Sequence, residues 1–160
     1  MIIRKMTEND IVAVKEVAEK SWNDTYAGII PLDVQTKFLH IAYNPDQLKK
    51  RMENTHIFVA EIAGKVTGFA NFLPVENGVS ELAAIYLHPA SKGKGIGTAL
   101  LQKGIKSLGI EKVIVHVEKD NHSGMIFYHA KGFQKESEFE NDLFGHTLKI
   151  VRMTLKVGGN

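Results

Sequence analysis

The chain contains no cysteine among its 160 residues. Disulfide bonds, thiolate metal sites, iron–sulfur clusters and a cysteine nucleophile are therefore excluded. The chain also lacks any run of about 18 consecutive apolar residues, the length that a membrane-spanning helix needs. Its first ten residues, MIIRKMTEND, become charged within four positions and have no apolar stretch typical of a signal peptide. These absences predict a cytoplasmic protein without a membrane partner.

An excess of one charge is missing as well, because 20 Lys and Arg stand against 18 Asp and Glu, a formal net charge of +2. This balance argues against a nucleic-acid partner held by bulk electrostatics, so any basic site has to be local. Hydrophobic residues make up 44% and charged residues 24% of the chain, which is typical of a folded protein and not of a disordered one. The length suits one core, and no repeat or linker marks a second. We expect a single domain over residues 1–156 and a flexible tail at residues 157–160.

The spacing of apolar residues predicts alternating strands and helices. The expected elements are, in order, a strand (2–6), a helix (11–22), two short helices (32–39 and 45–52), three strands joined by tight turns (56–62, 66–73 and 79–87), a helix (95–108), a strand (112–117), a helix (121–131) and two closing strands (133–139 and 147–155). The three consecutive strands form an antiparallel meander. The β-branched run at 112–117 is typical of a strand covered on both faces.

Three glycines occupy alternate positions in KGKGIG, directly before the helix at 95–108. Residues 91–106 also contain four lysines and no acid. A helix N-terminus presents unpaired backbone N–H groups and the positive end of the helix dipole, and both attract anions. Glycine has no Cβ to hold a phosphate away from these amides, and it allows the positive φ angles that aim them at one point. The loop is therefore expected to bind a diphosphate.

Other interpretations of the glycines stay open. A P-loop needs G-x-x-x-x-G-K-[ST], and that spacing is absent because Thr98 and Ala99 follow Gly97. A dinucleotide fingerprint G-x-G-x-x-G would need a glycine at position 98, and its fold is mostly parallel. Glu118 does lie about 20 residues on, as an NAD-binding enzyme would require. A glycine-rich turn with solvated lysines is the simplest alternative.

The segment LHPASKGKGIGTALL resembles motif A of the GNAT (Gcn5-related N-acetyltransferase) superfamily, [RQ]-x-x-G-x-[GA], which reads KGKGIG here. Residues 121–133, NHSGMIFYHAKGF, are similar to motif B of that family. The resemblance implies an α/β (α+β) fold with a central mixed, mostly antiparallel seven-stranded sheet, flanked by helices, whose strands 4 and 5 splay apart. Lys92 stands where the family has Arg or Gln, which keeps a charge but loses a planar group with several donors.

The resemblance also implies an acetyl-CoA-dependent N-acetyltransferase that acts on a primary amine of a small polyamine-like or amino compound, or of a peptide. Acetyl-CoA would be the acyl-donor cosubstrate and would lie between the splayed strands. The residues implied to bind it are Ile85, Tyr86, Leu87, Lys92, Gly93, Lys94, Gly95, Ile96, Gly97, Thr98, Asn121, Tyr128 and Lys131. No metal is expected, because the seven histidines show no ligand spacing. A homodimer is compatible with the sequence.

Two residues are implied to take part in the chemistry. An amine with a pKa of about 10.4 is neutral only about once in 2,500 molecules at pH 7, so a proton acceptor is needed. Glu81 lies where the family places such a carboxylate, which acts directly or through a water relay, and solvent itself is a second possible acceptor. The alternative is a strand glutamate paired with a surface lysine. Tyr128 matches the family tyrosine that faces the departing sulfur, with a core aromatic as the alternative. His116, expected on the splayed strand, could tune the site or be solvated.

The segment SWNDTYAGIIP lies between the first strand and the meander. In the family, this region and the final hairpin set the acceptor specificity. Trp22, Asp24 and Tyr26 could form a pocket for a cationic amine through ring faces and one carboxylate. The same residues could instead pack the end of the helix. A coenzyme-A-binding regulatory module of the same fold, without acetyl transfer, is the alternative to an enzyme.

Overall fold

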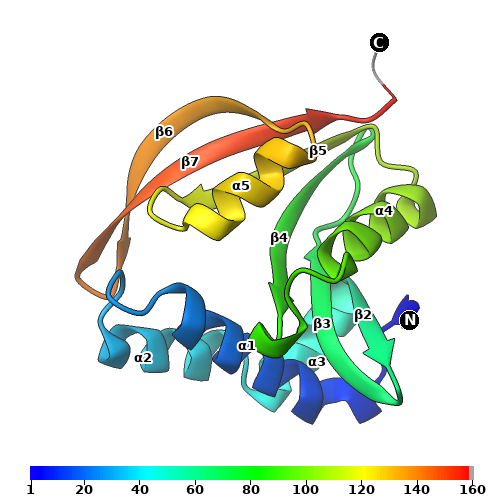
Figure 1. Ribbon diagram of the computed structural model, residues 1–160, viewed down its shortest axis with the longest axis horizontal. Coiled ribbons are helices and arrows are strands. Elements are labelled where there is room, and N and C mark those ends of the chain that lie inside the picture. Colours follow the sequence, from blue (N-terminus) through cyan, green and yellow to red (C-terminus); the bar gives the residue numbers. More distant parts are fainter. Residues whose placement is uncertain (159–160) are drawn as a thin grey trace.

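The computed structural model describes residues 1–158 of the chain (Figure 1). The elements are β1 (Ile2–Lys5), η1 (Glu8–Asp10), α1 (Ile11–Thr25), α2 (Leu32–Ala42), α3 (Pro45–Asn54), β2 (His56–Ile62), β3 (Lys65–Phe72), β4 (Val79–Leu87), η2 (Pro89–Ser91), α4 (Ile96–Leu108), β5 (Lys112–Glu118), α5 (His122–Ala130), β6 (Gln134–Leu143) and β7 (His146–Lys156). Every expected helix and strand is present. The last two strands are longer than expected because their connection contains only Phe144 and Gly145.

The seven strands form one sheet in the order β1-β2-β3-β4-β5-β7-β6. Only β4 and β5 pair in parallel, and every other neighbouring pair is antiparallel, which confirms the expected fold class. A dinucleotide-binding fold is mostly parallel, so that interpretation of the glycines is wrong. The tail prediction falls partly outside the described residues, since it includes 159–160. Within the described part, the Val157 amide donates to the Glu111 carbonyl at 2.8 Å.

The two parallel strands stay together over a short distance only. Their registered pairs run from Val79 with Lys112 to Glu81 with Ile114, although β4 continues to Leu87 and β5 to Glu118. Beyond Glu81 the two strands part, and the sheet opens between them as expected. In Figure 1, β4 runs away from the β6–β7 hairpin, with α5 beside that hairpin and α4 beside the β2–β4 half.

Apolar side chains form one buried cluster on each face of the sheet, because alternate residues of a strand point to opposite faces. On one face, α1 and α3 cover the β1–β4 half, with Val14 and Leu48 among the buried residues. On the other face, α4 packs Leu100 and Leu101 against Phe72 and Val113. The β1–β4 half of the sheet thus lies between α1 and α3 on one face and α4 on the other.

Between Lys112 and Val117 the strand β5 is covered on one face only, and Glu118 beyond them is buried. Val113, Val115 and Val117 are buried, whereas Ile114 is half-buried and His116 is exposed. The expectation that both faces are covered is therefore wrong. The physical reason is that α1 packs on β3 and β4, so the same face of β5 stays open to solvent. A run of β-branched residues does not distinguish these two situations.

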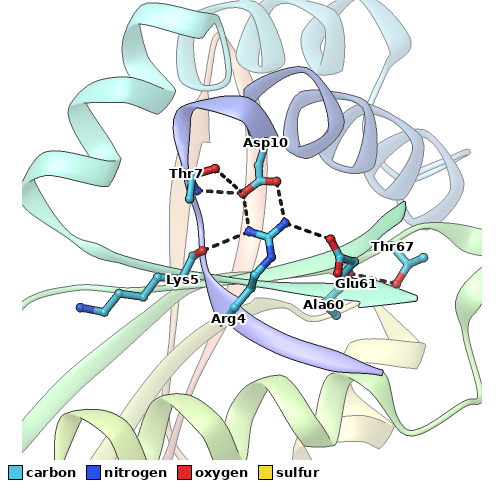
Figure 2. Close-up of polar contacts among 7 residues, drawn as sticks. All are labelled: Arg4, Lys5, Thr7, Asp10, Ala60, Glu61 and Thr67. Atoms are coloured by element: carbon cyan, nitrogen blue, oxygen red, sulfur yellow. Dashed lines mark hydrogen bonds and ion pairs between the residues drawn. The ribbon is translucent and has the colours of Figure 1, made fainter. Parts of the chain in front are cut away.

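A polar network fastens β1 to the start of α1 and to β2 (Figure 2). The Arg4 guanidinium donates to both carboxylate oxygens of Asp10, at 2.7 and 2.9 Å, and to Glu61 Oε1 at 3.3 Å. Asp10 also accepts the backbone N–H of Thr7 at 2.8 Å and is only 5% exposed. The Arg4 guanidinium, through its hydrogen bonds, holds the pKa of Asp10 below its ordinary value of 3.8.

We expect Asp10→Asn to lower the free energy of unfolding by about 2 kcal/mol at pH 7, because hydrogen bonds to a charged group contribute roughly 1.5–3 kcal/mol. A lowered folded-state pKa stabilises the fold above the unfolded value and loses this effect as the pH falls through the folded value. The difference between wild type and variant should therefore shrink from pH 7 to pH 3 in urea unfolding. The control Glu16→Gln, at an exposed carboxylate of α1, should change little. An equal difference at both pH values would contradict this account.

Candidate active site

A cavity of about 420 Å³ lies where β4 and β5 part. Its walls come from the last turns of α1, the second half of β4, the loop before α4, the end of β5 and the helix α5. Of the implied residues it is lined by Trp22, Tyr26, Ile85, Tyr86, Leu87, Lys92, Gly93, Gly95, Ile96, Gly97, Thr98, Asn121, Tyr128 and Lys131. Asp24, Glu81 and Lys94 are not part of this lining. Most of the residues implied by the two motifs thus share one hollow.

The glycine loop has the geometry that its sequence predicts. Gly93 and Gly95 have φ angles of 77° and 78°, and a Cβ added to either would meet nothing within 4 Å. Gly95 is the N-cap of α4, so the first amides of the helix lie open to the cavity. Such amides, together with the helix dipole, suit a phosphate group.

Gly97 has a different role from its two neighbours. It is buried within α4, and a Cβ there would lie 3.0 Å from Cε1 of Phe127 on α5. A glycine at this position therefore lets α4 and α5 approach across the opening. Sequence reasoning assigned all three glycines to phosphate binding and missed this packing role, which depends on a contact between segments 30 residues apart.

Lys92 and Asp24 are paired with each other. Their side-chain atoms Nζ and Oδ2 lie 2.9 Å apart, and both side chains are exposed, at 40% and 48%. The sequence placed Lys92 on phosphates and Asp24 at an acceptor amine, whereas here each neutralises the other. Exposed ion pairs contribute about 0–1 kcal/mol, so a stronger charged ligand can displace either partner.

A bulge bends β4 inside the cavity. Asn71 pairs with Ala84 and Phe72 pairs with Leu82, so Ala83 is an extra residue on β4. Bulges bend a strand and strengthen its twist, which turns β4 away from β5 just beyond their last registered pair. Ala83 and its neighbours line the cavity without having been predicted, because no turn residue marks the bulge in the sequence.

Tyr128 is both a core residue and a cavity residue. It is 8% exposed, and its ring packs edge-on against Phe127 and Phe133 at centroid distances of 5.4 and 5.2 Å. Burial, with a smaller contribution from Tyr86, raises the pKa of Tyr128 above 10. The hydroxyl therefore stays protonated at neutral pH and can donate a hydrogen bond into the cavity, whereas full proton release is unfavourable.

The start of α5 contributes a capped helix end. Asn121 Oδ1 accepts the backbone N–H of Gly124 at 2.9 Å and the Ser123 hydroxyl at 3.2 Å. Its Nδ2 group takes no part in the cap and can donate to other groups, among them the Tyr26 hydroxyl, which lines the same cavity. Lys131, at the other end of α5, lies 5.7 Å from the centroid of the Phe127 ring and also lines the cavity. The cap and a ligand contact can therefore coexist at Asn121.

Aromatic residues close the cavity on the α1 side. Trp22 stacks on Phe38 of α2, with centroids 4.3 Å apart, and tilts against Tyr26 at 4.6 Å. Within residues 1–158 the Trp22 Nε1 donor is buried and has no hydrogen-bond partner. Trp22 and Tyr26 pack the helix end, as the alternative interpretation expected, and they also line the cavity. Ser21 and Thr25 line it too, and the i, i+4 spacing from Ser21 to Thr25 could have identified them.

Glu81 meets a histidine rather than the lysine of the alternative interpretation. Its Oε1 lies 2.7 Å from Nδ1 of His116 on β5, and both side chains are about one-third exposed. The His116 ring packs edge-on against Phe139 of β6 at 5.6 Å. His116 lines the cavity, whereas Glu81 does not. Sequence reasoning missed this pair because it depends on the register in which Glu81 faces Ile114.

No helix within residues 1–158 is long and apolar enough to cross a membrane. In the same part of the chain, no three His, Asp or Glu side chains gather as possible ligands of a metal ion.

A sheet that opens between its two parallel strands, beside a glycine loop at a helix N-terminus, is the arrangement that the resemblance implied for an N-acetyltransferase. The chain belongs to the acetyltransferase (GNAT) family, whose model matches residues 16–133. It is 33% identical to the uncharacterized N-acetyltransferase YuaI of Bacillus subtilis, over 93% of this chain and 89% of YuaI. It is 30% identical to the spermidine N(1)-acetyltransferase of Thermoplasma acidophilum, over 88% of this chain and 92% of that protein.

The solved structures agree with this assignment. The crystal structure of the PaiA N-acetyltransferase of Thermoplasma acidophilum, in complex with coenzyme A, is similar with a TM-score of 0.85 and 26% identity, covering 97% of this chain and 98% of that one. The present chain is therefore an acetyl-CoA-dependent N-acetyltransferase of the GNAT family.

Proposed function

We propose that the protein transfers the acetyl group of acetyl-CoA to the primary amine of a small polyamine-like or amino compound, or of a peptide, by direct attack in a ternary complex. The cavity between β4 and β5 carries this proposal, because one hollow joins the glycine loop to the aromatic end of α1. Donor and acceptor can thus meet there. The similarity to a spermidine N(1)-acetyltransferase over most of both chains supports an amine of the polyamine type as the first candidate.

The coenzyme's diphosphate would lie on the open amides from Gly93 to Thr98, with the ammonium groups of Lys92 and Lys94 close by. Asn121 and Lys131 would contact it from α5. The pantetheine arm would follow residues 85–87 in the manner of an added strand, and an amide at Leu87 would polarise the thioester carbonyl. Binding of the diphosphate would draw Lys92 away from Asp24 and so free a carboxylate on the acceptor side.

The acceptor would enter beside α1. The ring faces of Trp22 and Tyr26 attract a cation, and Asp24 adds a negative charge at the edge of the opening. Glu81 would promote the removal of a proton from the amine. The buried Tyr128 hydroxyl would donate a hydrogen bond to the departing thiolate. Because burial raises the pKa of Tyr128, stabilisation of the thiolate is favoured over complete proton transfer.

A screen of amines tests this function. Release of coenzyme A from acetyl-CoA should be measured with spermidine, spermine, putrescine, amino sugars, amino acids and peptide N-termini. Turnover with at least one polyamine-like or amino compound is the expected result, and mass spectrometry should find the product heavier by one acetyl group. Tight coenzyme A binding without turnover of any amine would favour a regulatory module instead.

We expect Tyr128→Phe to lower kcat about tenfold and to leave the Kd of coenzyme A within about twofold. The variant keeps the ring that packs against Phe133 and removes only the hydrogen bond to the thiolate, and such a bond to a charged group contributes roughly 1.5–3 kcal/mol. Since the hydroxyl stays protonated, the loss should be the same from pH 6 to pH 9. Tyr43→Phe, at a buried tyrosine outside the cavity lining, is the matched control and should retain its activity. An unchanged kcat in Tyr128→Phe would remove this role.

A further inference from the structure

The contact between Glu81 and His116 lies at the point where the sheet opens. Glu81 belongs to the last registered pair of β4 and β5, and His116 lies two residues beyond its partner Ile114. The two side chains therefore bridge the strands where main-chain pairing ends. At a distance of 2.7 Å a proton has to lie between Nδ1 and the carboxylate oxygen, because two lone pairs would otherwise face each other. We assign this proton to Nδ1 because an imidazole is a stronger base than a carboxylate.

This contact decides which imidazole nitrogen is free. A neutral histidine carries one proton, and the partner of one nitrogen sets the state of the other. With Nδ1 protonated beside Glu81, Nε2 has the lone pair. A carboxylate that orients an imidazole through Nδ1 and leaves Nε2 as the proton acceptor is the arrangement that activates nucleophiles in other enzymes.

We propose that His116 is the proton acceptor for the incoming amine and that Glu81 is a positioning residue acting through it. This inference rests on the proposed function and refines the role of Glu81 within it. His116 lines the cavity and Glu81 does not. An imidazole is also, by its chemistry, a stronger base than a carboxylate.

The remaining neighbours of His116 fit this role. Phe139 of β6 packs against the ring and restricts its rotation. Arg152 of β7, which faces His116 in the sheet, is engaged by Glu136 at 2.8 Å, and this carboxylate offsets its positive charge. The charged groups beside the imidazole are thus Glu81 on β4, Arg152 on β7 and Glu136 on β6. Because the two carboxylates outnumber the one guanidinium, their combined charge favours a transient imidazolium.

The proposed step balances in atoms and charge. The acceptor ammonium gives one proton to Nε2 of His116, and the neutral nitrogen forms a bond to the thioester carbonyl carbon. The carbon–sulfur bond then breaks, and coenzyme A leaves as a thiolate beside Tyr128. The nitrogen then loses its second proton to the departing thiolate, which becomes the thiol of coenzyme A. His116 releases the first proton to solvent.

Two variants and their combination test the assignment with the amine that wild type turns over best. We expect His116→Gln to lower kcat/KM about a hundredfold at pH 7.5 and Glu81→Gln about tenfold, with the Kd of acetyl-CoA within twofold of wild type. The double variant should lose no more than His116→Gln, because Glu81 acts only through the imidazole. His116→Gly should regain activity on addition of imidazole, and His40→Gln, at an exposed histidine of α2 outside the cavity, should match wild type. A larger loss in Glu81→Gln than in His116→Gln would overturn the proposal.

A measurement without turnover separates this proposal from the function itself. Nitrogen-15 NMR of the histidine side chains at pH 8 should show His116 protonated at Nδ1 in wild type, and Glu81→Gln should shift the population toward the Nε2-protonated form. If no amine reacts, the proposed function is contradicted. The NMR measurement still shows whether Nδ1 or Nε2 of His116 carries the proton. A His116 protonated at Nε2 in wild type would overturn the inference whatever the activity.

Discussion

Gly95→Asp should weaken coenzyme A binding about a hundredfold and leave the protein folded. The new carboxylate would stand at the N-cap of α4, beside the amides proposed to hold the diphosphate. Two unit charges 5 Å apart repel by about 3 kcal/mol at an effective dielectric constant of about 20, which is a factor of about 100 in affinity. Aspartate is favoured at helix N-caps and tolerates positive φ angles better than most residues, so α4 should persist. Isothermal titration calorimetry with coenzyme A measures the loss.

The other end of the same helix offers a matched control. Gly109 is the C-cap of α4, has a φ of 64° and, like Gly95, has no atom within 4 Å of an added Cβ. Gly109→Asp therefore imposes similar backbone strain at a distance of about 20 Å along the helix, and should leave coenzyme A affinity within twofold of wild type. Added salt should reduce the defect of Gly95→Asp because it screens charges. Equal losses in both variants would contradict a phosphate site on this loop.

The fold could be predicted in outline because each element carries its own local signal. Period-2 alternation identified the meander, and Asn121 and Gly132 marked the two ends of α5. The open face of β5 could not be predicted, since Val113 to Val117 read the same whether one face or two are covered. Coverage is decided by where α1 docks, and α1 is 90 residues away in the sequence. The bulge at Ala83 could not be predicted for a similar reason, because only the pairing of β4 with β3 defines it.

The candidate site also has features that could be predicted from the sequence and features that could not. The backbone features at Gly93 and Gly95 follow from local conformation, and the sequence predicted their positive φ angles correctly. Pairings between side chains depend on register across the sheet or on docking of a loop, so neither Glu81 with His116 nor Lys92 with Asp24 could be found in advance. Each paired residue had been singled out by itself. The structure supplied the partner of each.

The position of the glycine loop depends on how closely α4 packs on the sheet. Gly104, in the middle of α4, faces Phe72 of β3, and a Cβ there would lie only 2.1 Å from the ring carbon Cε2. Phe72 is fully buried, so the ring has no free space into which to move. Any larger residue at position 104 must push α4 outward, and the amides at its N-terminus move with it.

We expect Gly104→Leu to lower the free energy of unfolding by about 3 kcal/mol, at the upper end of the range for overpacked cores, and to weaken coenzyme A binding as well. Phe72→Ala alone should cost about 3–5 kcal/mol through the cavity that it leaves. In the double variant a large side chain at position 104 faces a small one at position 72. Its loss in the free energy of unfolding should therefore be smaller than the sum of the single losses by at least 2 kcal/mol. Urea unfolding measures the stabilities, and calorimetry measures the recovery of affinity. Additive losses would mean that position 104 does not set the distance between α4 and β3, and the link from core packing to the diphosphate loop would fail with it.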